Sequence, residues 1–346
     1  MDQYKSKKIK ENLWKILVVV FALAFAAVVT YFRLDSIVSR FRFYKDGQTL
    51  IFVDKYVSAA DNRHFRASWK SIAEKFLAES GLDKALSGKQ ADYRPEVVFL
   101  VQNYYSIIDL QDPYIEKKLR GKPSTDIQLL QKARTSSFFD SFISHSFTSQ
   151  DGRYIFISEI TNLEEDVVYA IMHGLAGKNM PDSAKTELRG DSNWNFDTFV
   201  TWMMIEEMTA LTAQELQKAF TAGKTLDQGL DAILELPADY YTNQESNPVK
   251  KFTEYYFLNF QISNKIPELY QMSLDMAKHL IGKLGYNGYM SYIAKIAGGN
   301  YSTVNELVFE NMTDYINPVL TYYDEISRIA RKASRRVSAG STPAGQ

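Results

Sequence analysis

The chain has 346 residues, 45% of them hydrophobic, and a formal net charge of -1. This length can bury one sizeable core or two smaller ones. The balanced charge argues against a nucleic-acid partner, which would favour a clearly basic domain. The sequence contains no cysteine, which excludes disulfides, thiolate metal sites and a cysteine nucleophile.

The N-terminus predicts a membrane anchor. Residues 1–12 contain four lysines, and residues 13–32 form an apolar run whose one charge, Lys15, lies near its end. About 20 apolar residues cross a bilayer core, and a lysine near the end can reach the headgroups. Because a basic flank stays in the cytoplasm, we expect a single-pass protein of the inner (cytoplasmic) membrane. Residues 1–12 would be inside, and the C-terminal domain in the periplasm or outside the cell.

A cleaved signal peptide is the alternative interpretation of this segment. Ala22-Leu23-Ala24 and Ala24-Phe25-Ala26 resemble cleavage sites. The apolar run continues past both of them to Phe32, which favours an uncleaved anchor. A helix buried in a soluble core is the third interpretation.

Residues 33–135 are predicted to form a membrane-proximal α/β region. We expect residues 33–47 to continue as a helix that ends at Asp46-Gly47. The segments "TLIFVDKY" and "EVVFLVQ" are predicted strands because β-branched and aromatic residues dominate them.

A helix is predicted between these two strands, in "HFRASWKSIAEKFLAES", and it should end before Gly81. Its apolar residues have helical spacing and share one face. These residues are Phe65, Trp69, Ile72 and Phe76.

Residues 136–335 are predicted to be mostly helical. A turn at Asp151-Gly152 precedes "RYIFIS", which alternates as a half-buried strand does. Thr161-Asn162-Leu163-Glu164 matches a capping box that opens the next helix. Further helices are predicted at 194–220, 226–236, 248–262, 267–284, 303–311 and 315–335, with a second capping box at Thr303-Val304-Asn305-Glu306.

The order of the elements gives an α+β class dominated by helices. We expect an N-terminal transmembrane helix, a small sheet and a helical C-terminal lobe. The last residues, 336–346, are expected to be a disordered tail because they are small and polar.

The helix opened by the first capping box carries a histidine in a suggestive position. A zinc peptidase places two histidines four positions apart on one helix face, as H-E-x-x-H, with the glutamate as general base. This chain reads His173-Gly174-Leu175-Ala176-Gly177. Gly174 stands where the general base would be, and Gly177 where the second histidine would be.

This arrangement of a strand, a capped helix with a histidine, a break and a long helix with glutamates resembles the zincin-type bacterial metallopeptidases. The resemblance covers residues 136–216 and can extend through 297–307. It implies a degenerate zincin-like domain, in which Glu207, followed by Ala210 as in E-x-x-A, stands at the third metal-ligand position. His173, Gly174, Gly177 and Glu207 are then vestigial metal-site positions.

The glycines have chemical consequences for such a site. A general base contributes about 10²–10⁴-fold to a rate, and Gly174 offers no carboxylate. Gly177 has no ligating atom. We therefore expect no catalytic residue, no bound metal and no other cofactor.

Glu207 lies in the middle of an apolar stripe on its helix, where a carboxylate is costly to bury without a partner. We expect its side chain to point at His173, within direct or water-bridged hydrogen-bond reach. Glu206 is expected to be the solvated neighbour. The alternative is a plain capped helix without peptidase ancestry, in which Gly177 is the C-cap and Lys178 complements the helix dipole.

The leading functional hypothesis is a membrane-anchored pseudo-peptidase that acts as an envelope interaction or assembly protein. Its partners would be the lipid bilayer, through residues 13–32, and an envelope protein bound in a vestigial cleft. "RYIFIS" is expected at the sheet edge beside that cleft, where a peptide can add as a strand. The candidate cleft residues are Tyr154, Phe156, Tyr169 and Met203. The alternatives are an active hydrolase with rearranged metal ligands, and a helical envelope scaffold without peptidase ancestry.

Overall fold

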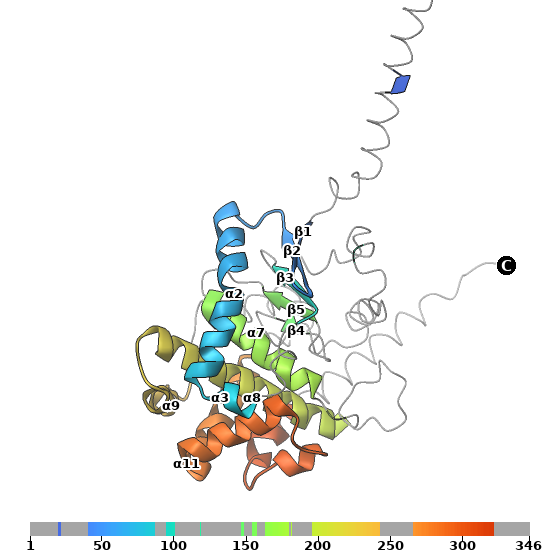
Figure 1. The fold of residues 1–346 in the computed structure, drawn as a ribbon. Helices are drawn as coiled ribbons and strands as arrows, with labels where there is room; N and C mark the ends of the chain where they lie inside the picture. Colours follow the sequence, from blue (N-terminus) through green and yellow to red (C-terminus); the bar gives the residue numbers. More distant parts are fainter. Residues whose placement is uncertain are drawn as a thin grey trace, which may run out of the picture.

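A computed structural model shows a helix-dominated α+β fold with one small sheet (Figure 1). It describes residues 20–21, 41–86, 95–100, 118, 147–148, 154–157, 163–179, 181, 196–242 and 266–321. The predicted class, helices with a small sheet and a helical C-terminal part, is confirmed at this level.

The sheet has five strands in the order β1-β2-β3-β5-β4. Their bounds are β1 (Phe41–Asp46), β2 (Thr49–Asp54), β3 (Val97–Leu100), β4 (Phe147–Thr148) and β5 (Tyr154–Ile157). The central strands β2, β3 and β5 are parallel, and β1 and β4 run antiparallel at the two edges. All residues of β2 and β3 are buried, as expected for parallel strands covered on both faces.

Alternate residues of the central strands face two different environments. Ile51, Val98 and Ile155 belong to the main hydrophobic core with the helices. On the other face, the rings of Phe52 and Phe99 stack with their centroids 5.1 Å apart.

The prediction of a helix through residue 46 is wrong, because residues 41–46 form β1. The segment "FRFYKD" alternates apolar and polar side chains at its start, over residues 41–43, and it pairs along its whole length with β2. The turn between the two strands uses Gly47, whose φ of 61° suits a two-residue hairpin loop.

The predicted helix before Gly81 is confirmed as α2 (Ala59–Glu79), which begins five residues earlier than expected. The Ser58 side chain caps it by accepting the N–H of Asp61. The predicted apolar face is buried, with Phe65, Trp69, Ile72 and Phe76 all in the core. A short helix, α3 (Leu82–Ala85), follows.

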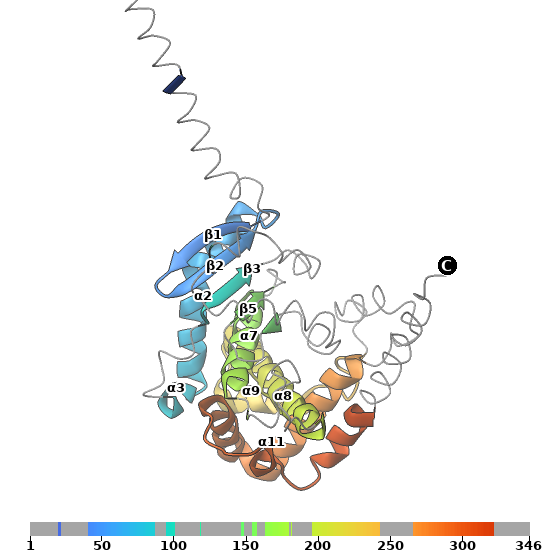
Figure 2. The same ribbon diagram turned by 90° about the vertical axis from the view of Figure 1, so that its right-hand side faces the viewer.

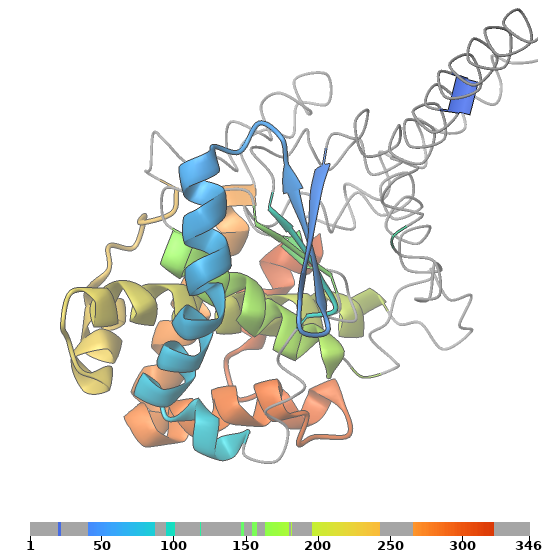
Figure 3. The same cartoon turned by 45° about the horizontal axis from the view of Figure 1, so that its top comes forward.

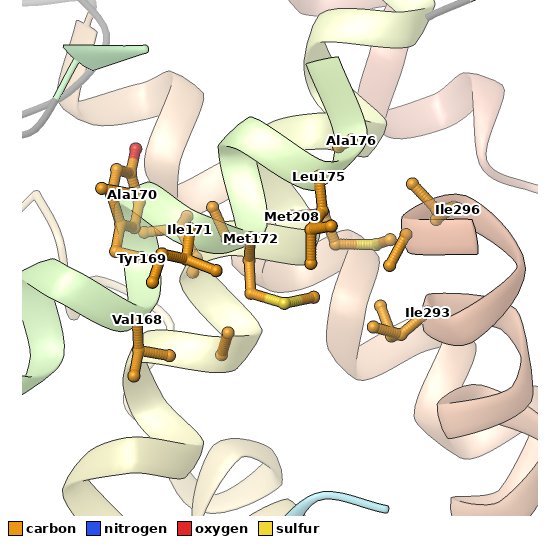
Figure 4. Close-up of a cluster of buried hydrophobic side chains, with 14 of the residues drawn as sticks. Val168, Tyr169, Ala170, Ile171, Met172, Leu175, Ala176, Met208, Ile293 and Ile296 are labelled. Atoms are coloured by element: carbon orange, nitrogen blue, oxygen red, sulfur yellow. The ribbon is translucent and has the colours of Figure 1, made fainter. Parts of the chain in front are cut away.

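Two long helices form the centre of the domain, α7 (Leu163–Lys178) and α8 (Phe196–Thr221). They pack directly against each other, and α2 lies against α7 (Figure 2). In Figure 4, Met172 of α7 and Met208 of α8 lie close to Ile293 and Ile296 of α11. The predicted helix 194–220 is confirmed within two residues.

The C-terminal part contains α9 (Leu226–Glu235), α11 (Ile266–Gly298) and the 3₁₀ helix η4 (Val304–Leu307), followed by a helix over 313–321. α11 is broken by Gly285, whose φ of 67° and ψ of 170° lie outside the helical region. The predicted helix 267–284 ends at this break, and the segment after it was missed.

The predicted helix 303–311 and its capping box are wrong. One 3₁₀ turn forms instead, and Thr303 makes no side-chain cap. The carboxylate of Glu306 binds Ser302, accepting from its hydroxyl and from its backbone N–H.

Several predictions concern residues outside the described ranges. These are the capping residues Thr161 and Asn162, the turn Asp151-Gly152, the helix 248–262, most of 315–335 and the tail 336–346. Of the apolar run 13–32, the structure describes Val20 and Phe21, which are helical. Among the described residues, no helix is both long and apolar enough to cross a bilayer.

Candidate functional site

The candidate site lies where α7 and α8 cross. Most residues of both helices are buried, and most of these buried residues are apolar. α7 contributes Tyr169 and His173, four residues apart and therefore on one face. α8 contributes the consecutive residues Glu206 and Glu207.

The predicted contact between His173 and Glu207 is present. Nε2 of His173 lies 3.1 Å from Oε2 of Glu207. Glu207 is fully buried, whereas the side chain of His173 keeps 10% of its surface exposed. His173 thus provides the polar partner that a carboxylate buried on an apolar helix face requires.

The expectation that Glu206 is solvated is wrong. Its Oε1 lies 3.1 Å from Nδ1 of His173, and its side chain is 11% exposed. Consecutive residues on a helix diverge by about 100°, so Glu206 and Glu207 flank the imidazole from two sides. Each ring nitrogen of His173 therefore faces its own carboxylate.

Tyr169 is the fourth side chain of this group, and it is buried. Its hydroxyl donates to Oε1 of Glu207 over 2.6 Å and lies 3.0 Å from Nε2 of His173. The rings of Tyr169 and His173 meet edge to face, with their centroids 4.7 Å apart. Sequence reasoning named Tyr169 as a cleft residue and missed this role, although its spacing of four from His173 could have indicated it. We call Tyr169, His173, Glu206 and Glu207 the histidine cluster.

The two carboxylates favour the imidazolium form of His173. Each ring nitrogen faces a carboxylate oxygen, and a ring with protons on both nitrogens can donate to both. Burial alone lowers the pKa of His173, but Glu207 and Glu206 outweigh this effect and raise it from 6.5 to about 10. Burial also raises the pKa of Glu207, an effect that His173 and Tyr169 oppose.

Gly174 and Gly177 are helical and buried within α7, which continues to Lys178. Neither glycine has a positive φ, so Gly177 is not the C-cap that the plain-helix alternative requires. Beyond the helix, the Asn179 amide donates to the carbonyls of Leu175 and Ala297, over 2.9 and 2.7 Å. This amide ties the end of α7 to the end of α11.

These residues do not fit a zinc ion of the peptidase type. Such a site needs three ligands that converge on one point with free lone pairs. Gly174 and Gly177 supply none, and the nitrogens of His173 point in different directions toward two carboxylates. Within the described ranges, no group of three or more His, Asp or Glu side chains is placed to hold a metal ion.

The candidate cleft residues are placed as follows. Tyr169 and Met203 are 3% and 6% exposed, so both belong to the core and offer almost no surface. Tyr154 and Phe156 lie on β5, and their side chains fall outside the described part of the chain. The expectation that "RYIFIS" forms the sheet edge is wrong, because β4 pairs with the outer side of β5.

The comparisons with known proteins give no relative. No protein-family model, no curated protein and no solved structure matches this chain. Its function is therefore inferred from its own residues.

Proposed function

We propose that this chain is a membrane-anchored, extracytoplasmic pseudo-peptidase that acts as an envelope interaction or assembly protein. Residues 13–32 would anchor it in the inner membrane. The folded part would be a zincin-like domain that has lost its catalytic groups and binds a protein partner without cutting it.

The observation that carries this proposal is the engagement of both nitrogens of His173 by carboxylates. An imidazolium has no lone pair, so it can neither ligate a metal nor accept a proton. The former catalytic position would thus have become a structural link between α7 and α8. An active hydrolase at this site would require His173 to release at least one carboxylate and a proton.

The edge strand β4 is where we place the partner. It lies at the end of the sheet and contacts α7. A strand at the edge of a sheet has backbone N–H and C=O groups to which an extended peptide can add. In this proposal β4, and not "RYIFIS", is the edge strand to which a partner peptide adds.

Metal analysis and peptidase assays of the purified full-length chain test the chemical half of the proposal. We expect no stoichiometric zinc and no cleavage of general peptide substrates. One tightly bound zinc per chain, lost together with a peptidase activity in His173→Ala, would overturn the pseudo-peptidase.

Affinity purification from the native membrane tests the binding half. The full-length chain should recover a defined envelope protein, identified by mass, in a stable ratio. A synthetic extended peptide from that partner should then compete for the complex. Failure of every partner peptide to compete would contradict strand addition at β4.

A further inference from the structure

One end of the domain brings together the start of β1, the end of β2 and the start of α2 (Figure 3). We call it the β1–α2 end. Arg42 holds it in shape, because its guanidinium donates to the carbonyls of Lys55 and Val57 over 2.8 and 3.3 Å. The loop that carries these carbonyls leads directly into α2 at Ala59.

The β1–α2 end presents an aromatic ring among basic side chains. Tyr56 is 69% exposed, and Leu234 is the other exposed large apolar side chain among the described residues from 41 onward. Lys55 precedes Tyr56 in the chain, and Arg63 lies in α2, where its Nε donates to the carbonyl of Ala59 over 3.2 Å; both side chains are exposed. A ring with a polar tip beside cationic groups is typical of side chains at a membrane–water interface.

The acidic side chains at this end are less exposed than the basic ones. Asp54 is fully buried, and its carboxylate accepts the N–H of Tyr56 over 3.0 Å. Asp61 is half-buried and accepts the hydroxyl of Ser58 over 2.6 Å. Because Asp54 is buried and Asp61 is half-buried, Lys55 and Arg63 are the exposed charged side chains among residues 54–63.

The chain length limits how far this end can lie from the anchor. Eight residues, 33–40, separate the apolar run from β1. Nine steps from Phe32 to Phe41 span at most roughly 30 Å even when fully extended. If residues 13–32 cross a bilayer, the start of β1 is held near its surface.

We propose that the β1–α2 end docks on anionic phospholipid headgroups of the membrane that holds residues 13–32. Lys55 and Arg63 contact lipid phosphates, and the ring of Tyr56 enters the headgroup layer. This inference rests on the proposed membrane anchor and adds a second contact, which fixes the orientation of the domain.

Site-directed spin labelling of the full-length chain tests the docking. The chain contains no cysteine, so each substitution gives a single labelled position. The three positions are Tyr56→Cys at the β1–α2 end, Ala78→Cys near the other end of α2, and Val20→Cys in the apolar run. Ala78 is exposed and lies about 28 Å from Ala59 along the helix axis.

The labelled chains are reconstituted in vesicles of phosphatidylglycerol and phosphatidylcholine, and collisions with a water-soluble nickel complex are measured. We expect protection at positions 56 and 20 and free access at position 78. In vesicles of phosphatidylcholine alone, or at high salt, protection at position 56 should be lost while position 20 stays protected.

Charge variants give a matched control. Lys55→Gln or Arg63→Gln should each weaken docking about fivefold, as expected for one basic side chain near an anionic surface. Arg42 is left unchanged because it holds the loop. Lys224→Gln, at an exposed lysine between α8 and α9, should change nothing.

The labelling experiment distinguishes a failure of the docking from a failure of the membrane anchor. Protection at position 20 with free access at position 56 overturns the docking and leaves the anchor in place. Free access at both positions overturns the anchor and the docking together. Equal protection at positions 56 and 78 would show non-specific adsorption of the whole domain, which also overturns docking through the β1–α2 end.

Discussion

Nε2 of His173 lies 3.1 Å from Oε2 of Glu207, across the interface of α7 and α8. The two residues are 34 positions apart in the sequence, and the contact joins the two central helices of the domain. A charge pair in this position has structural consequences that can be measured.

Breaking the pair should destabilise the domain strongly. His173→Gln leaves two carboxylates near each other in the core, and Glu207→Gln leaves the imidazolium with Glu206 alone. Each change should lower the free energy of unfolding by ~3–5 kcal/mol, as found when one partner of a buried pair is removed. The double variant should lose less than the sum, by ~0.5–3 kcal/mol. Urea unfolding followed by tryptophan fluorescence measures all four chains of this cycle.

The exposed pair of Lys75 and Glu79 provides the control for this cycle. Their charged atoms are 3.8 Å apart and their side chains are 62% and 38% exposed. The same glutamine changes there should show a coupling of ~0.5 kcal/mol or less. Strictly additive effects of His173→Gln and Glu207→Gln would contradict the central role of the histidine cluster.

The stability of the domain should fall as the pH rises through the range of His173. Its pKa in the folded chain is about 10, against an ordinary value of 6.5. Folding therefore favours the protonated ring, and the resulting stabilisation is complete below about pH 6.5 and lost as the pH approaches about 10. Because one pKa unit corresponds to ~1.4 kcal/mol, the full loss is on the order of several kcal/mol.

The comparison with His173→Gln isolates this contribution from the titration of lysines and tyrosines. The difference in unfolding free energy between the native chain and His173→Gln should shrink steadily between about pH 6.5 and about pH 10. A difference that stays constant over this range would show that His173 is not held as an imidazolium.

The contact of His173 with Glu207 was predictable because burial of a carboxylate on an apolar stripe demands a partner. The role of Glu206 was not predictable from periodicity, since its position beside the stripe suggested solvent. The imidazole of His173 lies between the carboxylates of two consecutive residues on the facing helix. This position depends on how α7 and α8 cross, which the periodicity of the sequence does not give.

The strand β1 shows a second limit of the sequence. Residues 33–47 have apolar spacing that a helix accepts, and the alternation in "FRFYKD" covers only its last part. The choice of a strand depends on pairing with β2, which local propensity does not contain. The face of α2 was predictable because its four large apolar residues repeat with the helical period over several turns.

Gly285 should be essential for the shape of α11. Its φ of 67° and ψ of 170° belong to a region that only glycine adopts readily. Gly285→Ala should lower the unfolding free energy by ~1–3 kcal/mol. Gly282→Ala is the control, because Gly282 is helical and exposed, and a Cβ added to it would meet no atom within 4 Å.

The control Gly282→Ala should change the unfolding free energy in the opposite direction. Alanine is favoured over glycine inside a helix by about 1 kcal/mol, so Gly282→Ala should raise stability. Thermal unfolding of both variants against the native chain measures the two effects. A neutral or stabilising Gly285→Ala would show that α11 can straighten without loss.

The topology of the chain should follow its basic N-terminus. Four lysines within residues 1–12 precede the apolar run 13–32, and such a flank remains in the cytoplasm. Alkaline phosphatase fused after Gln346, which folds only outside the cytoplasm, should therefore be active, whereas a fluorescent reporter that fails to fold after export should be dark. The same pair of fusions after residue 12 should give the reverse pattern. A chain recovered with its N-terminus near Ala26 would identify residues 13–32 as a signal peptide, and cytoplasmic activity of the fusion after Gln346 would overturn both the topology and the proposed envelope function.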